Sequence, residues 1–295
     1  MRIVLTGGTG FLGSALAEAL AARRHDVVVL SRSAGGNYRD VRYASLNRAA
    51  SEIDGADAVI NLAGAGIADE RWTPARKAEL LQSRISITRT IVNACANATA
   101  RPTVLISGSA VGYYGSSLDR TFDESSPAGS YFLGQLCASW EQEARRVEAS
   151  GVRCVIIRTG LVLGPHGGLL KKMVPPFKMF VGGPVGSGRQ WMSWIQLDDW
   201  IAMVSGLLTD ETVHGPVNLV APSPVTNRDF SRALGRALHR PSLMPLPEFA
   251  VRTIFGELAD GALLASQNVH STCAFVQAFP FTSPALRDAL ARSLS

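Results

Sequence analysis

Three glycines near the N-terminus constrain the fold of this chain more than any other feature. Gly7, Gly10 and Gly13 follow a short apolar run at 2–6 and precede a segment in which leucines recur with helical spacing. A second apolar run at 26–30 completes a strand, helix, strand unit, the context in which this spacing predicts a dinucleotide-binding turn, although a purely structural glycine turn is the alternative. Such glycines allow a tight turn, close approach of backbone amides to a pyrophosphate and packing of helix on strand. The candidate cofactor residues of this turn are Gly7, Thr9, Gly10, Phe11, Leu12 and Gly13.

Strand-like and helix-like segments alternate over the first two thirds of the chain. Further strands are predicted at 57–62, 103–106 and 153–157, and helices at 74–98 and 132–149. Because parallel neighbouring strands need crossover connections, this order predicts an α/β fold with a Rossmann-type doubly wound parallel sheet.

A small, mostly helical C-terminal domain on the substrate side is expected to follow the sheet. We place a dinucleotide-binding domain at 1–221, with a glycine-rich and proline-rich substrate-side insertion at about 164–195, and the small domain at 222–295. Ser283 and Pro284 are predicted to cap and open its last helix.

The residues after the second and third strands indicate which cofactor the turn would bind. Ser31 and Arg32 follow the second strand with no acidic residue nearby, whereas an NAD site places a carboxylate there to bind the ribose 2'-hydroxyl. Arginine suits a 2'-phosphate, so we predict NADP(H) in preference to NAD(H), the alternative being that Arg32 is a solvated loop residue. Small residues after the third strand would permit close approach of the cofactor. Leu62, Ala63, Gly64 and, on the next strand, Ser107 therefore join the candidate cofactor residues.

The positive charge of the chain is concentrated in one region. The net charge of +5 comes from 29 basic and 24 acidic residues, and no acidic residue lies between 165 and 192. Lys171, Lys172 and Lys178 fall in one eight-residue window, which suits a phosphate-bearing ligand better than nucleic acid, because no basic run spans a face. A solvated basic loop is the alternative. The candidate substrate residues are Lys171, Lys172, Lys178, Arg189 and Trp191.

Several other classes of site are not supported by the sequence. The four cysteines have no paired spacing, so we predict neither a metal site nor a disulfide framework. The first residues lack the basic and then apolar regions of a signal peptide, and no apolar run has membrane-spanning length. We therefore expect a cytoplasmic protein with a small-molecule substrate and neither nucleic acid nor membrane as partner. A monomer and a homodimer both stay open.

Longer motifs resemble the extended short-chain dehydrogenase/reductase superfamily, and more closely its epimerase family proteins. The resemblance covers nearly the whole chain and rests on VLTGGTGFLG, VINLAGAGI, ISGSAVGYYG, LCASWEQEA, RTGLVLGPHGG and GPVNLVAPSPVTN. It implies NADP(H)-dependent oxidoreductases with a small C-terminal domain. It also implies that Ser31, Arg32, Leu62, Ala63, Glu79 and Arg84 lie near the cofactor.

The resemblance also defines what is missing. The superfamily uses a serine together with a tyrosine and a lysine four residues later, in which the tyrosine exchanges a proton with the substrate. Ser109 matches the serine, but the positions expected for the other two hold Leu133 and Cys137. Tyr113 and Tyr114 are the candidate replacements, although both rings are as readily explained by packing.

We therefore expect an atypical short-chain dehydrogenase/reductase. Its activity would be that of an oxidoreductase or epimerase acting on a small, nucleotide-linked or phosphorylated substrate. The alternative is a non-catalytic NADP(H)-binding sensor or partner-binding protein. Where relatives carry a histidine before the acidic pair, this chain has Gln196, and Asp199 is interpreted as a residue that starts a helix.

Overall fold

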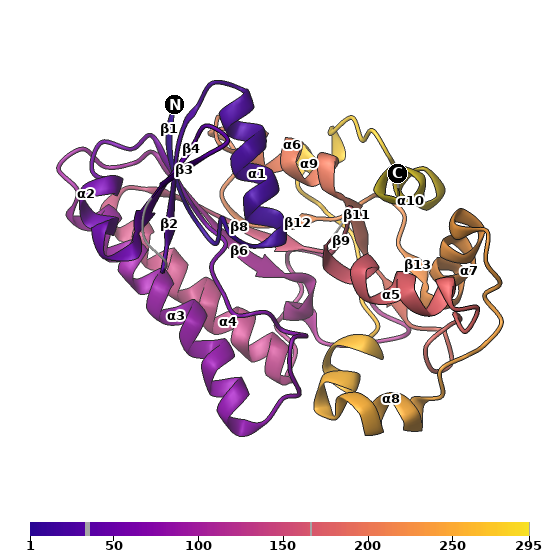
Figure 1. Cartoon of the computed structure of the whole chain (residues 1–295). Helices are drawn as coiled ribbons and strands as arrows, with labels where there is room; N and C mark the ends of the chain where they lie inside the picture. Colours follow the sequence, from indigo (N-terminus) through magenta and orange to yellow (C-terminus); the bar gives the residue numbers. More distant parts are fainter. Residues whose placement is uncertain (33–35, 166, 295) are drawn as a thin grey trace.

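An eight-stranded sheet forms the centre of the molecule in the computed structural model, which describes residues 1–32, 36–165 and 167–294 (Figure 1). The strand order is β12-β8-β6-β5-β1-β2-β4-β3, and every neighbouring pair is parallel except β3 and β4. The strands are β1 (Arg2–Thr6), β2 (Asp26–Ser31), β3 (Gly36–Tyr38), β4 (Val41–Ser45), β5 (Ala58–Asn61), β6 (Val104–Ala110), β8 (Arg153–Thr159) and β12 (Gly215–Leu219). The predicted doubly wound parallel sheet is confirmed.

Helices cover both faces of the sheet because the buried strands are apolar on both sides. On β1, Ile3 and Leu5 pack in the cluster that contains α1 (Phe11–Ala22) and α6 (Leu197–Leu207). Val4, between them, packs in the opposite cluster with α2 (Ala49–Ile53), α3 (Pro74–Asn97) and α4 (Phe132–Arg145). Figure 1 shows α3 and α4 running side by side below the sheet, where they cover one face.

Local signals placed several boundaries well. The run at 2–6 is β1, and α3 begins at Pro74 after Thr73, whose side chain accepts from the Arg76 amide as an N-cap. The predicted helix at 132–149 instead ends as α4 at Arg145, and 3-10 turns follow at Arg146–Ser150. The β3–β4 hairpin, the 3-10 turn Leu46–Arg48 and the short α2 were not predicted.

A second lobe, on the right in Figure 1, is built from segments on both sides of residue 222. Its cluster joins Leu163, Phe177 and Trp194 with Phe230 and Leu290. The 164–195 insertion therefore packs with the C-terminal residues, and part of it is helical despite its prolines. The elements are β9 (Leu161–Leu163), α5 (Gly168–Lys178), β10 (Trp191–Met192), β11 (Trp194–Gln196), β13 (Val225–Thr226), α7 (Asn227–Leu238), α8 (Glu248–Phe255), the π-turn Ala259–Leu263, β14 (Asn268–Val269, paired with β7, Thr121–Phe122) and α10 (Leu286–Leu294). α9 (Ala274–Gln277) instead packs with the main sheet, where Val276 joins the cluster that contains α1 and α6.

The start of the last helix differs from the prediction. α10 begins at Leu286, so Ser283 and Pro284 do not open it. The buried carboxylate of Asp199 accepts from the Ser283 amide at 3.1 Å and from the Thr282 amide at 2.9 Å, which fixes this segment on α6. Asp199 does lie in the first turn of α6, whose N-cap is the side chain of Gln196.

No helix within the described ranges is long and apolar enough to cross a membrane.

Candidate functional site

In the glycine turn between β1 and α1, backbone atoms leave no room for a side chain at Gly7 or at Gly13. Gly7 has φ +78°, and a Cβ on it would lie 2.6 Å from the carbonyl of Leu62, at the end of β5. A Cβ on Gly13 would lie 2.3 Å from the Gly7 oxygen, and the Gly10 amide donates to that same oxygen at 3.0 Å. The glycine pattern therefore shapes a turn pressed against the neighbouring strand.

The N-terminus of α1 fits an anionic group. Gly10 is its N-cap and brings no side chain, and the first turn has no acidic residue. Thr9 and Gly10 are exposed, whereas Phe11 and Leu12 are half-buried. The turn lies at the carboxyl ends of β1 and β5, between which the strand order reverses, the place where open α/β sheets bind ligands. Helix amides and the helix dipole favour a phosphate there.

Arg84 on α3 is a buried cation beside this turn. Its side chain is 8% exposed, and a Cβ on Gly64 would lie 2.8 Å from its guanidinium carbon. Its Nη atoms donate to the carbonyls of Leu80 and Ala65 at 3.0 and 3.1 Å. Among the described residues its Nε has no acceptor and no carboxylate pairs with it. Burial lowers the pKa of Arg84. Because no described carboxylate pairs with its guanidinium, an anionic group such as a pyrophosphate would be stabilised beside it.

The other polar residues expected near the cofactor are more exposed than Arg84. Glu79 is exposed and pairs with Arg76 at 2.7 Å, and Arg76 in turn donates to the carbonyl of Gly66 at 2.8 Å. This holds Glu79 to the loop between β5 and α3. Ser31 is half-buried at the end of β2 and Arg32, next to it, is exposed.

The remaining candidates at the strand ends are mostly buried. Leu62 is half-buried and Ala63 is buried at the end of β5. Ser107 lies within β6, where its buried hydroxyl has no hydrogen-bond partner among the described residues.

Ser109 is held by a buried ion pair that the sequence did not predict. Its hydroxyl donates to a carboxylate oxygen of Glu141 at 2.6 Å. Arg158, on β8, donates to both oxygens of Glu141, at 2.9 and 2.8 Å. Since the Ser109 proton is engaged, its free lone pairs can accept a hydrogen bond from a ligand.

The two candidate tyrosines have different surroundings. Tyr114 is 3% exposed, donates to Asn218 at 2.7 Å and accepts from Arg158 at 3.0 Å. Burial raises the pKa of Tyr114 to about 12, and its proton is already used within the core. Tyr113 is half-buried, its ring lies 3.5 Å from the guanidinium carbon of Arg158, and its hydroxyl makes no hydrogen bond to the described residues. Tyr113 is therefore the tyrosine with a proton to donate.

The positions expected for the missing tyrosine and lysine are filled by core residues. Leu133 is 8% and Cys137 2% exposed on α4. Burial raises the pKa of the Cys137 thiol to about 11, so the thiol stays protonated at neutral pH. A protonated, buried thiol is a poor nucleophile, so Cys137 does not replace the missing lysine with nucleophilic chemistry of its own.

The candidate substrate cations spread over the second lobe. A Cβ on Gly167, just before α5, would lie 2.0 Å from the ring of Phe11, so the start of α5 adjoins the glycine turn. Lys171, in its first turn, is exposed, and Lys172 donates to the carbonyl of Ala68 across the site. Lys178 closes the same helix and is exposed.

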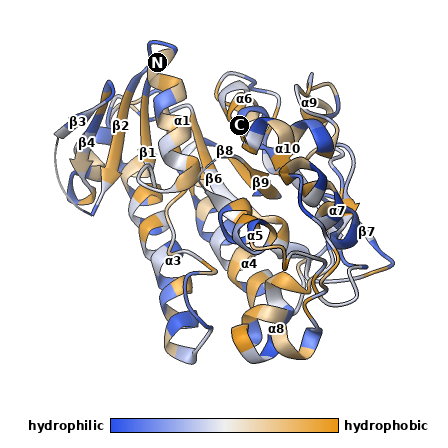
Figure 2. Cartoon of the chain, turned by 45° about the vertical axis from the view of Figure 1, so that its right-hand side comes forward, coloured by the Kyte–Doolittle hydropathy of each residue, from blue (hydrophilic) through white to orange (hydrophobic). Residues whose placement is uncertain are grey.

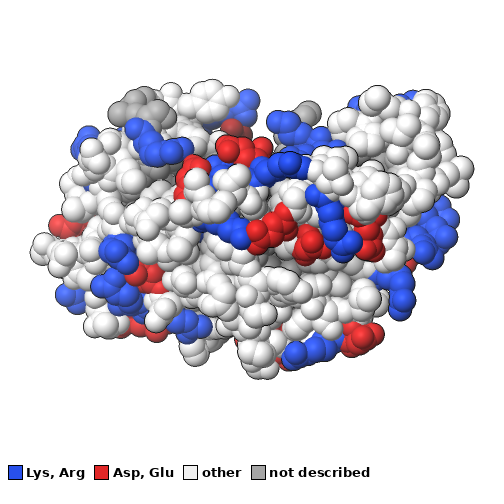
Figure 3. All heavy atoms as spheres, turned by 90° about the horizontal axis from the view of Figure 1, so that it is seen from below, with Lys and Arg blue, Asp and Glu red and all other residues white. Residues whose placement is uncertain are grey.

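The last two candidates lie farther along the second lobe. Arg189 is exposed, and Trp191 is half-buried, with its indole donating to the carbonyl of Leu118 at 3.2 Å. Seen from below, basic and acidic side chains alternate across the middle of the molecule instead of forming a cationic stripe (Figure 3).

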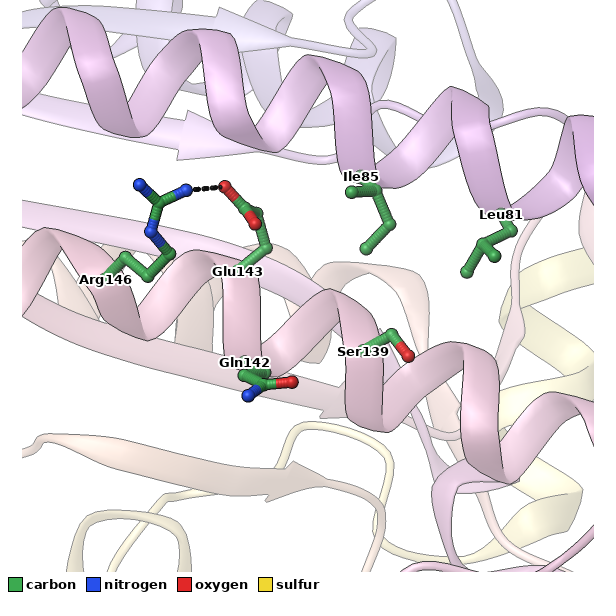
Figure 4. Close-up of a pocket in the computed structure, with 6 residues that line it drawn as sticks. All are labelled: Leu81, Ile85, Ser139, Gln142, Glu143 and Arg146. Atoms are coloured by element: carbon green, nitrogen blue, oxygen red, sulfur yellow. Dashed lines mark hydrogen bonds and ion pairs between the residues drawn. The ribbon is translucent and has the colours of Figure 1, made fainter.

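Two pockets lie apart from these residues. One, of about 450 Å³, is lined by residues of α3 and α4, and Figure 4 shows Ile85 of α3 on the same side as Glu143 and Arg146 of α4. The other, of about 460 Å³, lies beyond β12 and is lined by His270, Phe279 and Phe281 among others. Neither contains a candidate site residue, so the candidate site is defined by the turn and its neighbours.

Sequence reasoning missed the polar core beneath the site. Arg158 is a cation inside an apolar strand, VIIRT, and Asn218 lies in another buried strand. Buried polar residues of this kind must be paired, so their occurrence within apolar runs was the available signal. The partners themselves are not local, because Tyr114 and Asn218 are 104 residues apart.

A doubly wound sheet with a glycine turn at its switch point, and a second lobe over its carboxyl edge, defines a dinucleotide-binding α/β protein. The chain belongs to the NAD dependent epimerase/dehydratase family, whose model matches residues 3–219, and a domain of unknown function, DUF1731, matches 246–293. The resemblance to the extended short-chain dehydrogenase/reductase superfamily is thereby confirmed.

Individual relatives match over almost the full length of the chain. Epimerase family protein Mb2239 of Mycobacterium bovis is 42% identical, over 98% of this chain and 96% of its own. The crystal structure of human epimerase family protein SDR39U1 (isoform 2) with NADPH has a TM-score of 0.92 at 35% identity and covers 99% of both chains. A nucleoside-diphosphate sugar epimerase from Corynebacterium glutamicum has a TM-score of 0.80 at 30% identity, over 100% of this chain and 58% of its own.

Proposed function

We propose that this chain binds NADP(H) and acts as an atypical oxidoreductase or epimerase on a small anionic substrate, of the nucleotide-linked or phosphorylated kind. The observation that carries the proposal is the glycine turn beside Arg84, a buried cation that forms no ion pair with any described residue. A phosphate-bearing ligand supplies the missing negative charge.

The choice of NADP(H) has two supports. Arg32 follows β2 where a carboxylate would repel a 2'-phosphate. The human relative, which is 35% identical, has been crystallised with NADPH. The glycines of the turn, together with Leu62, Ala63, Glu79 and Arg84, would hold the cofactor, whose nicotinamide supplies or accepts the hydride.

Two side chains of this protein would act on the substrate oxygen, Tyr113 as a proton donor and Ser109 as a hydrogen-bond acceptor. Tyr113 has a free hydroxyl that can donate to a substrate oxygen, and the Arg158 guanidinium packs against its ring. Ser109 can accept from a substrate hydroxyl, because Glu141 fixes the direction of its proton. Tyr113 would thus supply the proton and Ser109 would orient the substrate oxygen, without the usual lysine.

An anionic substrate is supported by Lys171, next to the glycine turn, and by the C. glutamicum relative, a nucleoside-diphosphate sugar epimerase. The rival proposal is a cofactor-binding sensor or partner-binding protein. Such a protein would use the same glycine turn but would need no side chain that can donate a proton to a substrate. The free hydroxyl of Tyr113 favours the enzyme.

Calorimetric titration with NADPH and NADH tests the cofactor. We expect NADPH to bind at least about tenfold more tightly, since a charge-assisted hydrogen bond contributes about 1.5–3 kcal/mol. Arg32→Glu should remove this preference, whereas Arg232→Glu, an exposed charge reversal on α7, should keep it. Equal affinities of the wild type for both cofactors would refute the NADP(H) assignment.

Turnover is tested with nucleotide sugars and phosphorylated carbonyl compounds, followed by NADPH absorbance and by product analysis for epimers. Tyr113→Phe should lower kcat about 10²- to 10⁴-fold, the usual contribution of a general acid, with cofactor affinity unchanged. An undiminished rate in this variant would exclude Tyr113 as the acid. Tight NADPH binding with no turnover of any of these compounds would favour the sensor.

A further inference from the structure

Large apolar side chains are exposed mainly in one part of the second lobe. Of the exposed large apolar residues in the described ranges, eight lie either in the turn after α5 or in the segment leading into and through α8. Three of them stand far out, with Leu243 81%, Phe249 73% and Met179 72% exposed. The eight, which we call the apolar ridge, are Met179, Phe180, Val181, Leu243, Met244, Leu246, Phe249 and Ile254.

Backbone hydrogen bonds join the two segments into one surface. The Met244 amide donates to the Gly182 carbonyl at 3.3 Å, and the Leu246 amide donates to the Pro184 carbonyl at 2.9 Å. α8 continues from this paired segment and is coloured largely orange in Figure 2, at the lower end of the molecule. Eight exposed apolar side chains gathered on two paired segments are uncommon on a monomeric protein and indicate an interaction site.

The charges around the apolar ridge are positive in balance. Its acidic neighbours are already paired, Glu248 and Asp260 with Arg252 and Glu257 with Lys77. The basic neighbours have no such partners: Lys178 precedes Met179, and Arg240 lies 4.7 Å from the ring of Phe180.

Arg71 extends the same charge to α8. Its side chain donates to the carbonyls of Thr253 and Ile254. Within the described ranges none of Lys178, Arg240 and Arg71 forms an ion pair. Although Arg252 is shared by two carboxylates, basic side chains outnumber acidic ones next to the apolar ridge, and this surface carries a net positive charge.

We propose that the apolar ridge docks on an anionic lipid surface. Single side chains that are more than 70% exposed project from the protein and can enter the interfacial layer of a bilayer, and basic side chains beside them attract anionic headgroups. A folded protein partner would need a matching cavity for each projecting side chain, whereas a fluid layer adapts to all of them.

This docking goes beyond the expectation drawn from the sequence, which excluded a membrane partner because no spanning segment exists. Surface binding needs no span. The proposed docking surface includes the end of α5 with Lys178, a residue that the sequence predicted to contact the substrate. It does not depend on the proposed function.

Vesicle flotation tests the proposal with the full chain. We expect binding to vesicles of phosphatidylcholine mixed with phosphatidylglycerol, weak binding to phosphatidylcholine alone, and release as salt is raised. The triple variant Phe180→Ser, Leu243→Ser and Phe249→Ser should bind at least about tenfold more weakly. It lacks three exposed apolar side chains whose transfer from water into the membrane would favour binding. Lys178→Glu should also weaken binding.

A matched triple variant elsewhere on the surface controls for loss of apolar area. Tyr38→Ser, Leu118→Ser and Tyr131→Ser replace side chains that are 57%, 45% and 56% exposed, and should bind as the wild type does. Circular dichroism confirms folding of both triple variants. No binding of wild type to anionic vesicles, or equal binding of both triple variants, overturns the proposal. A dimer seen by sedimentation that only the ridge variant abolishes would assign the surface to a second copy and also overturn it.

Discussion

Glu141 and Arg158 form a bidentate ion pair in the interior, with side chains only 5% and 3% exposed. Burial by itself disfavours a charged guanidinium, but the hydrogen bonds and charge of Glu141 outweigh it and raise the pKa of Arg158. The same pair holds the hydroxyl of Ser109 and the ring of Tyr113. It thus connects the stability of the core to the geometry of the candidate site.

Removal of only one partner of this ion pair should strongly destabilise the protein. Arg158→Met leaves the Glu141 carboxylate buried without a partner, so we expect the free energy of unfolding in urea to fall by about 3–5 kcal/mol. The double variant Glu141→Met/Arg158→Met should lose less than the two single variants added together, because no charge is stranded. Glu18→Gln, which breaks an exposed pair with Arg39, is the control and should unfold like the wild type. An Arg158→Met protein as stable as this control would contradict the prediction.

Two glycines of the turn should have different roles: Gly13 is needed for folding, and Gly10 leaves space for the cofactor. A Cβ on Gly13 would collide with backbone at 2.3 Å, whereas on Gly10 the nearest atom lies at 3.4 Å. Gly13→Ala should lower the melting temperature and abolish the thermal shift given by NADPH. Gly10→Ala should melt near the wild-type temperature and lose most of the NADPH-induced shift, since its methyl group occupies the space a pyrophosphate needs. A full NADPH shift in Gly10→Ala would show that the ligand does not approach this turn.

Arg84→Met should lower the affinity for NADPH without lowering the stability of the unliganded protein. The substitution removes a buried charge that no carboxylate compensates, so the unliganded protein should be as stable as the wild type or more so. NADPH affinity should fall about 10- to 150-fold, the loss expected when a charge-assisted hydrogen bond is removed. Calorimetry and thermal melting measure the two effects. If both stability and affinity fell sharply, Arg84 would be a structural residue.

Stability should decline in mild alkali. Burial raises the pKa of Cys95 and Cys154 from an ordinary value near 9 to about 12. The folded-state pKa lies above the unfolded one, so the stability that each protonated thiol contributes is complete below pH 9 and is lost as pH rises from about 9 to 12. The free energy of unfolding should fall by about 1.4 kcal/mol per pH unit for each thiol over this range.

Urea unfolding at pH 8 to about 11, with a reductant present, measures this slope. Cys95→Ala and Cys154→Ala should each flatten it. Cys273→Ala removes a thiol that is only half-buried and is the matched control, with an unchanged slope. Equal slopes for all three variants would show that Cys95 and Cys154 do not cause the alkaline loss.

Local patterns were enough to predict the frame of this protein. The strand at 2–6, the glycine turn and the start of α3 at Pro74 depend on neighbours within a few residues, so spacing and capping chemistry indicate them directly. The alternation of strands and helices then leaves few topologies other than a doubly wound sheet. Predictions failed where a distant residue competes with a local signal. Asp199 takes the amide of Ser283, and α10 therefore begins at Leu286.

The sequence by itself determined the fold class and the position of the cofactor turn, because both follow from periodicity and from glycine geometry over short distances. Only the tertiary structure decided which polar residues stand behind Ser109, which of the two tyrosines keeps a free hydroxyl, and that Arg84 is buried without a carboxylate. Those outcomes depend on pairings across the sheet, such as Tyr114 with Asn218. Burial and partner choice are properties of the whole packed chain, and no window of sequence contains them.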